Sequence, residues 1–422
     1  MSVTANITRL ANGLRVVTNS MPQIQTAAVG VWVDSGARSE SEQLHGVSHM
    51  LEHMAFKGTR RRSARAIAEE IEAVGGHLNA YTGREQTAYF VRILKNDLPL
   101  AVDLLADILQ ESVFDSEELA REQDVIIQEI GQALDTPDDL VFEMMQAEAY
   151  PDQPMGRSIL GTEETVGGFT PDILRGHMGR NYRAPSMILS AAGAVDHAML
   201  VAMAQEKFGN LGPALPKNIQ PALWQGGDTR EEKDLEQAHL VLALEGVAYG
   251  DPDYYTAQVF STVLGGGMSS RLFQEVREKR GLCYSIYSFT GSHRDSGMLG
   301  IYAGSGAERL NELVKVIAGE VQSMTGKVSE NETARGRAQL KAGLLMSLES
   351  PSAQCEQMAR QLLIYGRVLT TEELVQRVDA VDAAALQRFA SRLLSAAKLT
   401  LSALGPVKSL ESGDKIAARF AS

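Results

Sequence analysis

The sequence predicts an α+β protein of two tandem related domains, each a mostly antiparallel sheet covered by helices. Short β-type runs and longer helical patterns follow one another in the same order in each half of the chain. The strand-then-helix pattern of AYFVRILKNDLPLAVDLLADIL recurs in GMLGIYAGSGAERLNELVKVIAGEV. A stretch rich in proline and glycine lies midway between them. The expected boundaries are a first domain at 1–212, a linker at 213–233 and a second domain at 234–422.

The first half begins with two β-type runs around Asn12-Gly13, a dipeptide typical of hairpin turns. Apolar residues then recur at strand or helical spacing, bounded by turn residues. The expected elements are strands GLRVVTN and AAVGVWVDSGA, helices near 46–56 and 64–74, strands HLNAYTG and TAYFVRIL, helices near 98–112, 116–134 and 140–149, strand MILSAAG, and a helix near 197–208.

The second half repeats this order. Its first strand, HLVLALEGV, is almost continuously apolar, as expected of a strand buried on both faces. The elements expected after it are helices near 254–264 and 270–279, strands CYSIYSF and GMLGIYAG, and long helices from 307 onward.

Composition limits the class of function. The chain is 44% apolar and 22% charged, which is typical of a folded protein. It carries 53 acidic and 40 basic residues, a net charge of −13, so we expect no nucleic-acid partner and a preference for basic peptides. Two cysteines, Cys283 and Cys355, exclude a disulfide scaffold. No apolar run reaches the roughly 20 residues of a membrane span, and no signal-peptide pattern is present. We therefore expect a cytoplasmic protein of the bacterial type, or an organellar one from which a presequence has been removed, without a membrane partner.

The strongest chemical signal is His49-Met50-Leu51-Glu52-His53. On a helix, two histidines four residues apart lie on one face, one turn from each other, and can bind one zinc ion. Glu52 lies beside that face and can act as general base without being a ligand. This order, HxxEH, is the inverzincin signature. The alternative is a pair of surface histidines, but the apolar residues between them indicate a partly buried helix.

A catalytic zinc ion needs a third protein ligand and one open position. The helix expected at 116–134 offers Glu117, Glu118, Glu122 and Glu129. Glu122 and Glu129 are two turns apart and therefore share a face. One could bind zinc while the other orients a histidine ring, and spacing alone does not say which.

The segment HGVSHMLEHMAFKGT resembles the zinc helix of the pitrilysin-type (inverzincin) metallopeptidases, and MAFKGT is most similar to the mitochondrial-processing-peptidase-like branch. The resemblance implies that Glu129 is the third ligand and that Glu122 supports a ligand histidine. It extends to GGHLNAYTGREQTAYF, where it implies that Asn79, Ala80 and Tyr81 flank a bound peptide.

In the second half, LGGGMSSRLFQEVREKRGLCYSIYS resembles the family segment that carries an arginine and a tyrosine seven residues apart. Here these are Arg277 and Tyr284, which the resemblance implies bind the substrate backbone and its carbonyl. Without this resemblance, Tyr284 would be interpreted as a strand residue packed in a core and Arg277 as a solvated helix residue.

The sequence thus predicts a zinc-dependent endopeptidase with one zinc ion per chain and Glu52 as general base. The resemblance implies hydrolysis of oligopeptides or extended segments in a chamber formed by a homodimer or a heterodimer. Arg277 and Tyr284 would line that chamber. The alternative is a catalytically silent scaffold or regulatory subunit of the same fold. The four residues His49, Glu52, His53 and Glu129 argue against it, because such subunits usually lose zinc ligands.

Overall fold

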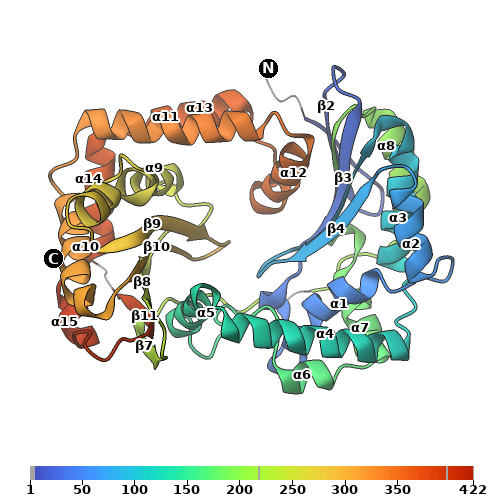
Figure 1. Ribbon diagram of the computed structural model, residues 1–422. Helices are drawn as coiled ribbons and strands as arrows, with labels where there is room; N and C mark the ends of the chain where they lie inside the picture. Colours follow the sequence, from blue (N-terminus) through green and yellow to red (C-terminus); the bar gives the residue numbers. More distant parts are fainter. Residues whose placement is uncertain (1–4, 217–218, 396–397, 422) are drawn as a thin grey trace. The chain divides into compact units, whose positions relative to one another are not determined.

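The structure, a computed structural model, describes residues 5–216, 219–395 and 398–421. It forms two compact units, each built around one sheet (Figure 1). Unit 1 comprises Met1–Gly131, Arg157–Gln220 and Leu345–Thr371, and unit 2 comprises Gln132–Gly156, Pro221–Leu344 and Glu372–Ser422. Both units mix sheet and helix, which confirms the predicted α+β class.

Unit 1 has a six-stranded sheet in the order β1-β2-β6-β3-β5-β4. All neighbours are antiparallel except β2 and β6, and β1 and β2 form the expected hairpin. The strands are β1 (Asn6–Arg9), β2 (Arg15–Ser20), β3 (Thr26–Val33), β4 (His77–Thr82), β5 (Thr87–Leu94) and β6 (Met187–Gly193).

Helices cover both faces of this sheet. One face packs with α1, α2, α3, α4, α7 and α8 in a single apolar core, and α12 packs on the other. These and α6 have the following bounds: α1 (Val47–Ala55), α2 (Ala64–Glu72), α3 (Leu98–Gln110), α4 (Ser116–Asp135), α6 (Glu163–Gly167), α7 (Pro171–Asn181), α8 (His197–Phe208) and α12 (Pro351–Tyr365). Because both faces are covered, β3 is buried along seven of its eight residues, and its sequence TAAVGVWV is almost wholly apolar.

Unit 2 has a five-stranded sheet in the order β7-β11-β8-β10-β9, in which only β7 and β11 are parallel. Its strands are β7 (Gly227–Glu232), β8 (Ala238–Glu245), β9 (Cys283–Ser292), β10 (Gly297–Ser305) and β11 (Thr400–Gly405). Its helices are α5 (Pro137–Ala149), α9 (Tyr254–Gly265), α10 (Leu310–Ser323), α11 (Glu330–Ser347), α13 (Thr371–Asp379), α14 (Ala383–Ser395) and α15 (Gly413–Ala418). The helix α5 packs on one face of the sheet, and α9, α10 and α14 pack on the other.

Each sheet is therefore covered on one face by a helix from the opposite half of the sequence. Leu362 and Cys355 of α12 are buried against Trp32 and Ile188 of the first sheet. The Ser190 hydroxyl on β6 also donates to the Cys355 carbonyl at 2.7 Å. In unit 2, the Ser402 hydroxyl on β11 donates in the same way to the carbonyl of Val141 on α5 at 2.9 Å.

Several elements differ from the sequence-based expectation. Helices α6 and α7 and strand β11 were not expected, and β7 lies within the segment expected to be a linker. A π-helical turn at Phe273–Glu278 stands where an α-helix over 270–279 was expected. Short 3₁₀ turns lie at Ala37–Ser39, Glu42–Leu44, Lys95–Asp97, Ala184–Ser186 and Ala307–Arg309. Among the described residues, no helix is both long enough and apolar enough to cross a membrane.

Candidate active site

Helix α1 presents the HxxEH residues because its other face is apolar. Met50, Leu51 and Met54 are fully buried in the core of unit 1. Helical spacing then places His49 and His53 together on the remaining face, where their ring centroids are 4.7 Å apart. Both histidines are half-buried, so water reaches their rings only in part.

Helix α4 brings a carboxylate to these two rings. Glu129 Oε2 lies 3.7 Å from His49 Nε2 and 3.7 Å from His53 Nε2. One ligand atom from each of His49, His53 and Glu129 lies within 4.8 Å of the other two. Side chains far apart in the sequence thus converge from two helices.

Glu122, two turns earlier on α4, contacts the opposite nitrogen of the second histidine. His53 Nδ1 donates to Glu122 Oε2 at 2.9 Å, which leaves Nε2 free to bind a metal. Lys57 Nζ lies 2.6 Å from the other carboxylate oxygen. Burial by itself would raise the pKa of Glu122, but the hydrogen bonds from Lys57 and His53 outweigh it and lower the pKa. Glu122 is therefore ionised and orients His53.

The three converging side chains fit a zinc ion. Donor atoms bound at about 2.0–2.1 Å to one tetrahedral ion lie roughly 3.4 Å apart. This is close to the 3.7 Å that separates Glu129 Oε2 from each of the two histidine Nε2 atoms. Burial and the neighbouring His53 lower the pKa of His49 to about 4, so His49 is neutral near pH 7, as a metal ligand must be. An imidazole pair with one carboxylate is a common donor set of catalytic zinc sites.

Glu52 lies on the same helix between the two histidines, and its carboxylate is held from the sheet. The hydroxyl of Thr82, at the end of β4, donates to Glu52 Oε2 at 2.6 Å. Burial raises the pKa of Glu52, and the hydrogen bond from Thr82 opposes that shift. A carboxylate with a raised pKa is suited to accepting a proton.

Among the residues that the structure describes, strand β4 is an edge of the sheet and pairs only with β5. The Gly83 N–H donates to the Gln86 carbonyl at 2.8 Å, so Gly83 and Gln86 form a hydrogen-bonded pair. From there along the antiparallel β4–β5 hairpin, non-hydrogen-bonded and hydrogen-bonded pairs alternate. This alternation directs the main-chain groups of Leu78, Ala80 and Thr82 away from β5.

The side chains of Asn79 and Tyr81 both form hydrogen bonds within unit 1. Asn79 Oδ1 accepts from the Ala80 N–H at 2.8 Å. The Tyr81 hydroxyl donates to Glu356 on α12 at 3.0 Å, on the face of the sheet away from α1. At this edge, the Ala80 N–H and both of these side chains are already hydrogen-bonded, whereas the Ala80 carbonyl and the main-chain groups of Leu78 and Thr82 face away from β5.

Arg277 and Tyr284 lie in unit 2 and contact each other. The Arg277 guanidinium lies 4.7 Å from the Phe273 ring centroid and 5.0 Å from that of Tyr284. Arg277 belongs to the π-helical turn, and Tyr284 follows on β9 with its side chain 77% exposed. Stacking between two aromatic rings orients the guanidinium plane while leaving its N–H groups able to donate.

Comparison with known proteins identifies the family. The model of insulinase (peptidase family M16) matches residues 15–163, and that of the peptidase M16 inactive domain matches residues 168–340. An uncharacterised zinc protease of Rickettsia felis is 40% identical over 403 residues, covering 95% of this chain and 97% of that protein. This chain belongs to peptidase family M16.

Two further similarities agree with membership of family M16. The probable mitochondrial-processing peptidase subunit beta of Arabidopsis thaliana is 39% identical, over 98% of this chain and 80% of its own length. A chain of complex III2 from Candida albicans has the same fold, with a TM-score of 0.88 at 20% identity over 99% of this chain and 100% of that one. The resemblance to a pitrilysin-type, processing-peptidase-like family is thereby confirmed.

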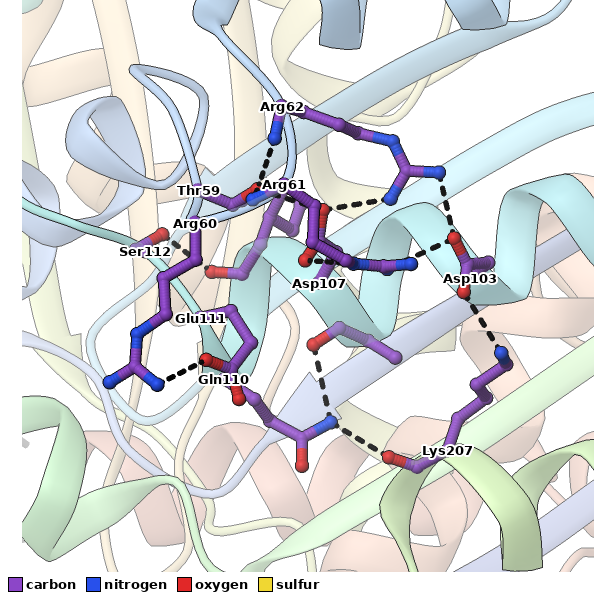
Figure 2. Close-up of polar contacts among 12 residues, drawn as sticks. Thr59, Arg60, Arg61, Arg62, Asp103, Asp107, Gln110, Glu111, Ser112 and Lys207 are labelled. Carbon is purple, nitrogen blue, oxygen red and sulfur yellow. Dashed lines mark hydrogen bonds and ion pairs between the residues drawn. The ribbon is translucent and has the colours of Figure 1, made fainter.

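The segment that follows α1 in this M16 chain is anchored to α3 (Figure 2). Arg62 donates to Asp107 at 2.8 Å and to Asp103 at 2.7 Å, and the Thr59 hydroxyl donates to Asp107 at 2.8 Å. Arg61 also bonds both aspartates. The Asp107 carboxylate is buried, and a buried carboxylate needs such partners. These bonds fix the chain at the C-terminal end of the helix that carries the histidines.

Sequence reasoning did not single out Thr82 or Lys57. Thr82 had a detectable signal, because it is a polar residue on the side of β4 that carries the core-facing Leu78 and Ala80. Lys57 follows the end of α1, and nothing in its spacing connects it to Glu122, 65 residues later.

Proposed function

We propose that this M16 chain is a zinc-dependent endopeptidase of the HxxEH type, with one zinc ion held by His49, His53 and Glu129. The observation that carries the proposal is the convergence of these three ligand atoms within 4.8 Å, beside Glu52 on the same helix. The zinc-protease name of the Rickettsia felis relative supports it.

Each residue has a separate task in the proposed hydrolysis. A zinc ion at this position would polarise the scissile carbonyl and make water more acidic. Glu52 accepts a proton from the attacking water and later donates it to the leaving amine. Thr82 holds the Glu52 carboxylate in place, and Glu122 holds the His53 ring.

We propose that an extended peptide binds by adding a strand at the free edge of β4, beside Asn79, Ala80 and Tyr81. The Ala80 carbonyl and the main-chain groups of Leu78 and Thr82 would supply hydrogen bonds, and side-chain pockets would supply selectivity. Arg277 would orient the peptide, and Tyr284 would donate to the developing oxyanion. The net charge of −13 supports a preference for basic peptides. Hydrolysis of a basic peptide should then slow as ionic strength rises, and an unchanged rate would remove that preference.

We further propose that the chain works as a dimer that encloses a chamber, either with itself or with a related chain. The name of the Arabidopsis thaliana relative, a subunit beta, supports partnership with another chain. Sedimentation of the purified protein, alone and with candidate related chains, tests this part separately.

The test of the enzyme combines zinc analysis with cleavage of a quenched fluorescent peptide. Wild type should bind one zinc ion and cleave, whereas Glu52→Gln should keep zinc and lose cleavage. Glu118→Gln, which changes an α4 carboxylate paired with Arg121, should match wild type in both assays. A wild-type protein that binds no metal and cleaves no peptide, alone or with a partner, would support the scaffold alternative instead.

A further inference from the structure

Glu40 is a buried carboxylate that lies outside the helices and contacts the start of α1. Its side chain is 5% exposed. The Gly46 N–H donates to Glu40 Oε2 at 2.7 Å, and the Ser48 N–H donates to Glu40 Oε1 at 2.7 Å. The first N–H groups of a helix have no partner within the helix, and here one carboxylate from the segment that precedes α1 accepts from two of them.

The residue at the start of α1 cannot provide this cap itself. Gly46 has no side chain, and its φ of 90° is in the left-handed region that favours glycine. A Cβ at Gly46 would lie 2.7 Å from the Cα of Gly161, and a Cβ at Gly161 would lie 2.7 Å from the His45 carbonyl oxygen. The two chain segments therefore cross without room for a side chain, which leaves Glu40 to cap the helix.

The two histidines of α1 differ in how their rings are oriented. His53 is fixed through its own ring, because Nδ1 donates to Glu122. His49 Nδ1 is buried and has no hydrogen-bond partner among the described residues. His49 is the third residue of α1 and directly follows Ser48, so its position depends on the backbone of the first turn.

We infer that Glu40 is a positioning residue for the metal-binding helix: by holding the N–H groups of Gly46 and Ser48, it fixes His49. This inference rests on the proposed zinc site. Burial raises the pKa of Glu40 to about 7, although hydrogen bonds from Ser48 and Gly46 and the nearby Arg157 act in the opposite direction. The two N–H groups bond to different oxygens of Glu40, and in a glutamine of the same size an NH2 donor replaces one of these oxygens, so one N–H group would lose its acceptor.

The experiment measures zinc affinity and amide exchange in the full-length chain. Zinc dissociation constants are obtained by competition with a chromophoric chelator, and hydrogen–deuterium exchange is followed at Gly46 and Ser48 without metal. Glu40→Gln should weaken zinc binding about 10-fold or more, the size expected for loss of a group that orients a metal ligand. It should also accelerate exchange at one or both amides.

The matched control removes a cap from another helix of unit 1. Asp196 Oδ1 accepts from the Met199 N–H at 2.8 Å at the start of α8, which carries no candidate ligand. Asp196→Ala should lower thermal stability and leave zinc affinity unchanged. If Glu40→Gln does not fold, Glu40→Asp, which keeps the charge and shortens the side chain, should show the same two changes to a smaller extent.

Two results would overturn the inference while leaving the proposed function intact. One is a zinc affinity of the folded Glu40 variant within twofold of wild type. The other is an equal loss of affinity in Asp196→Ala, because the effect would then follow overall stability. If wild type itself takes up no zinc, the proposed function fails, and this inference fails with it.

Discussion

Removing the Thr82 hydroxyl should change the pH dependence of peptide cleavage. Thr82→Val keeps the shape of the side chain and deletes the 2.6 Å hydrogen bond to Glu52. That bond stabilises the ionised form of Glu52 and opposes the effect of burial on its pKa. A general base acts in its ionised form, so activity is lost as pH falls through its pKa. The variant should therefore lose activity at a higher pH than wild type.

The size of this change follows from the energy of the bond. A hydrogen bond to a charged group contributes about 1.5–3 kcal/mol, and about 1.4 kcal/mol corresponds to one pH unit. Thr82 and Glu52 are both half-buried rather than fully enclosed, so the lower end applies. The acid limb of kcat/KM should move upward by about one pH unit.

The assay is the pH–rate profile of the zinc-loaded enzyme on a quenched fluorescent peptide whose own charge is constant over the range. Thr82→Ser is the matched control, because it retains the hydroxyl and should reproduce the wild-type limb. If the limbs of Thr82→Val and wild type coincide while the Thr82→Val protein remains folded and zinc-loaded, the bond does not act on the base.

Three other outcomes can be measured. Glu122→Gln should weaken zinc binding by about 10–100-fold in chelator competition, because it removes the charge that orients His53; an equal effect in Glu118→Gln would contradict this. Arg277→Lys keeps the charge but loses the planar stacking, so kcat/KM should fall with zinc content unchanged; unaltered kinetics would count against its role. Burial by itself would raise the pKa of Asp103, but its hydrogen bonds, of which that from Arg62 is the strongest, lower the pKa to about 2. The ionised Asp103 carboxylate therefore stabilises the fold above pH 4, and this stabilisation is lost as pH falls towards 2. Asp103→Asn should therefore cost about 2 kcal/mol in thermal unfolding at pH 7 and about half as much at pH 3, and an equal cost at both would refute the assignment.

The parts of the site that were predictable lie within single elements. His49 and His53 share a helix face because of their spacing, and the apolar residues between them indicate which face is buried. The choice between Glu122 and Glu129 was not decidable from spacing, because both lie on the same side of α4. In the structure, Glu129 lies near both Nε2 atoms and Glu122 bonds Nδ1 of His53, which supports the proposal that Glu129 is the ligand and Glu122 orients His53.

Contacts made by irregular segments, or between segments far apart in the chain, were not predictable in the same way. Glu40 lies in a stretch without periodicity, and its bonds to Gly46 and Ser48 depend on how the chain turns before α1. The ion pairs of Arg62 with Asp103 and Asp107 join residues more than 40 positions apart. No local pattern indicates which of many charged residues will meet.

By itself, the sequence determined the α+β class, most strands and helices, and the grouping of His49, Glu52 and His53. These properties follow from side-chain periods of two or 3.6 residues, which are local. Only the tertiary structure decided that α12 covers the first sheet and α5 the second. A sheet with two apolar faces needs a cover on each, but its sequence does not specify which helix will supply it, because that choice depends on packing between segments far apart in the chain.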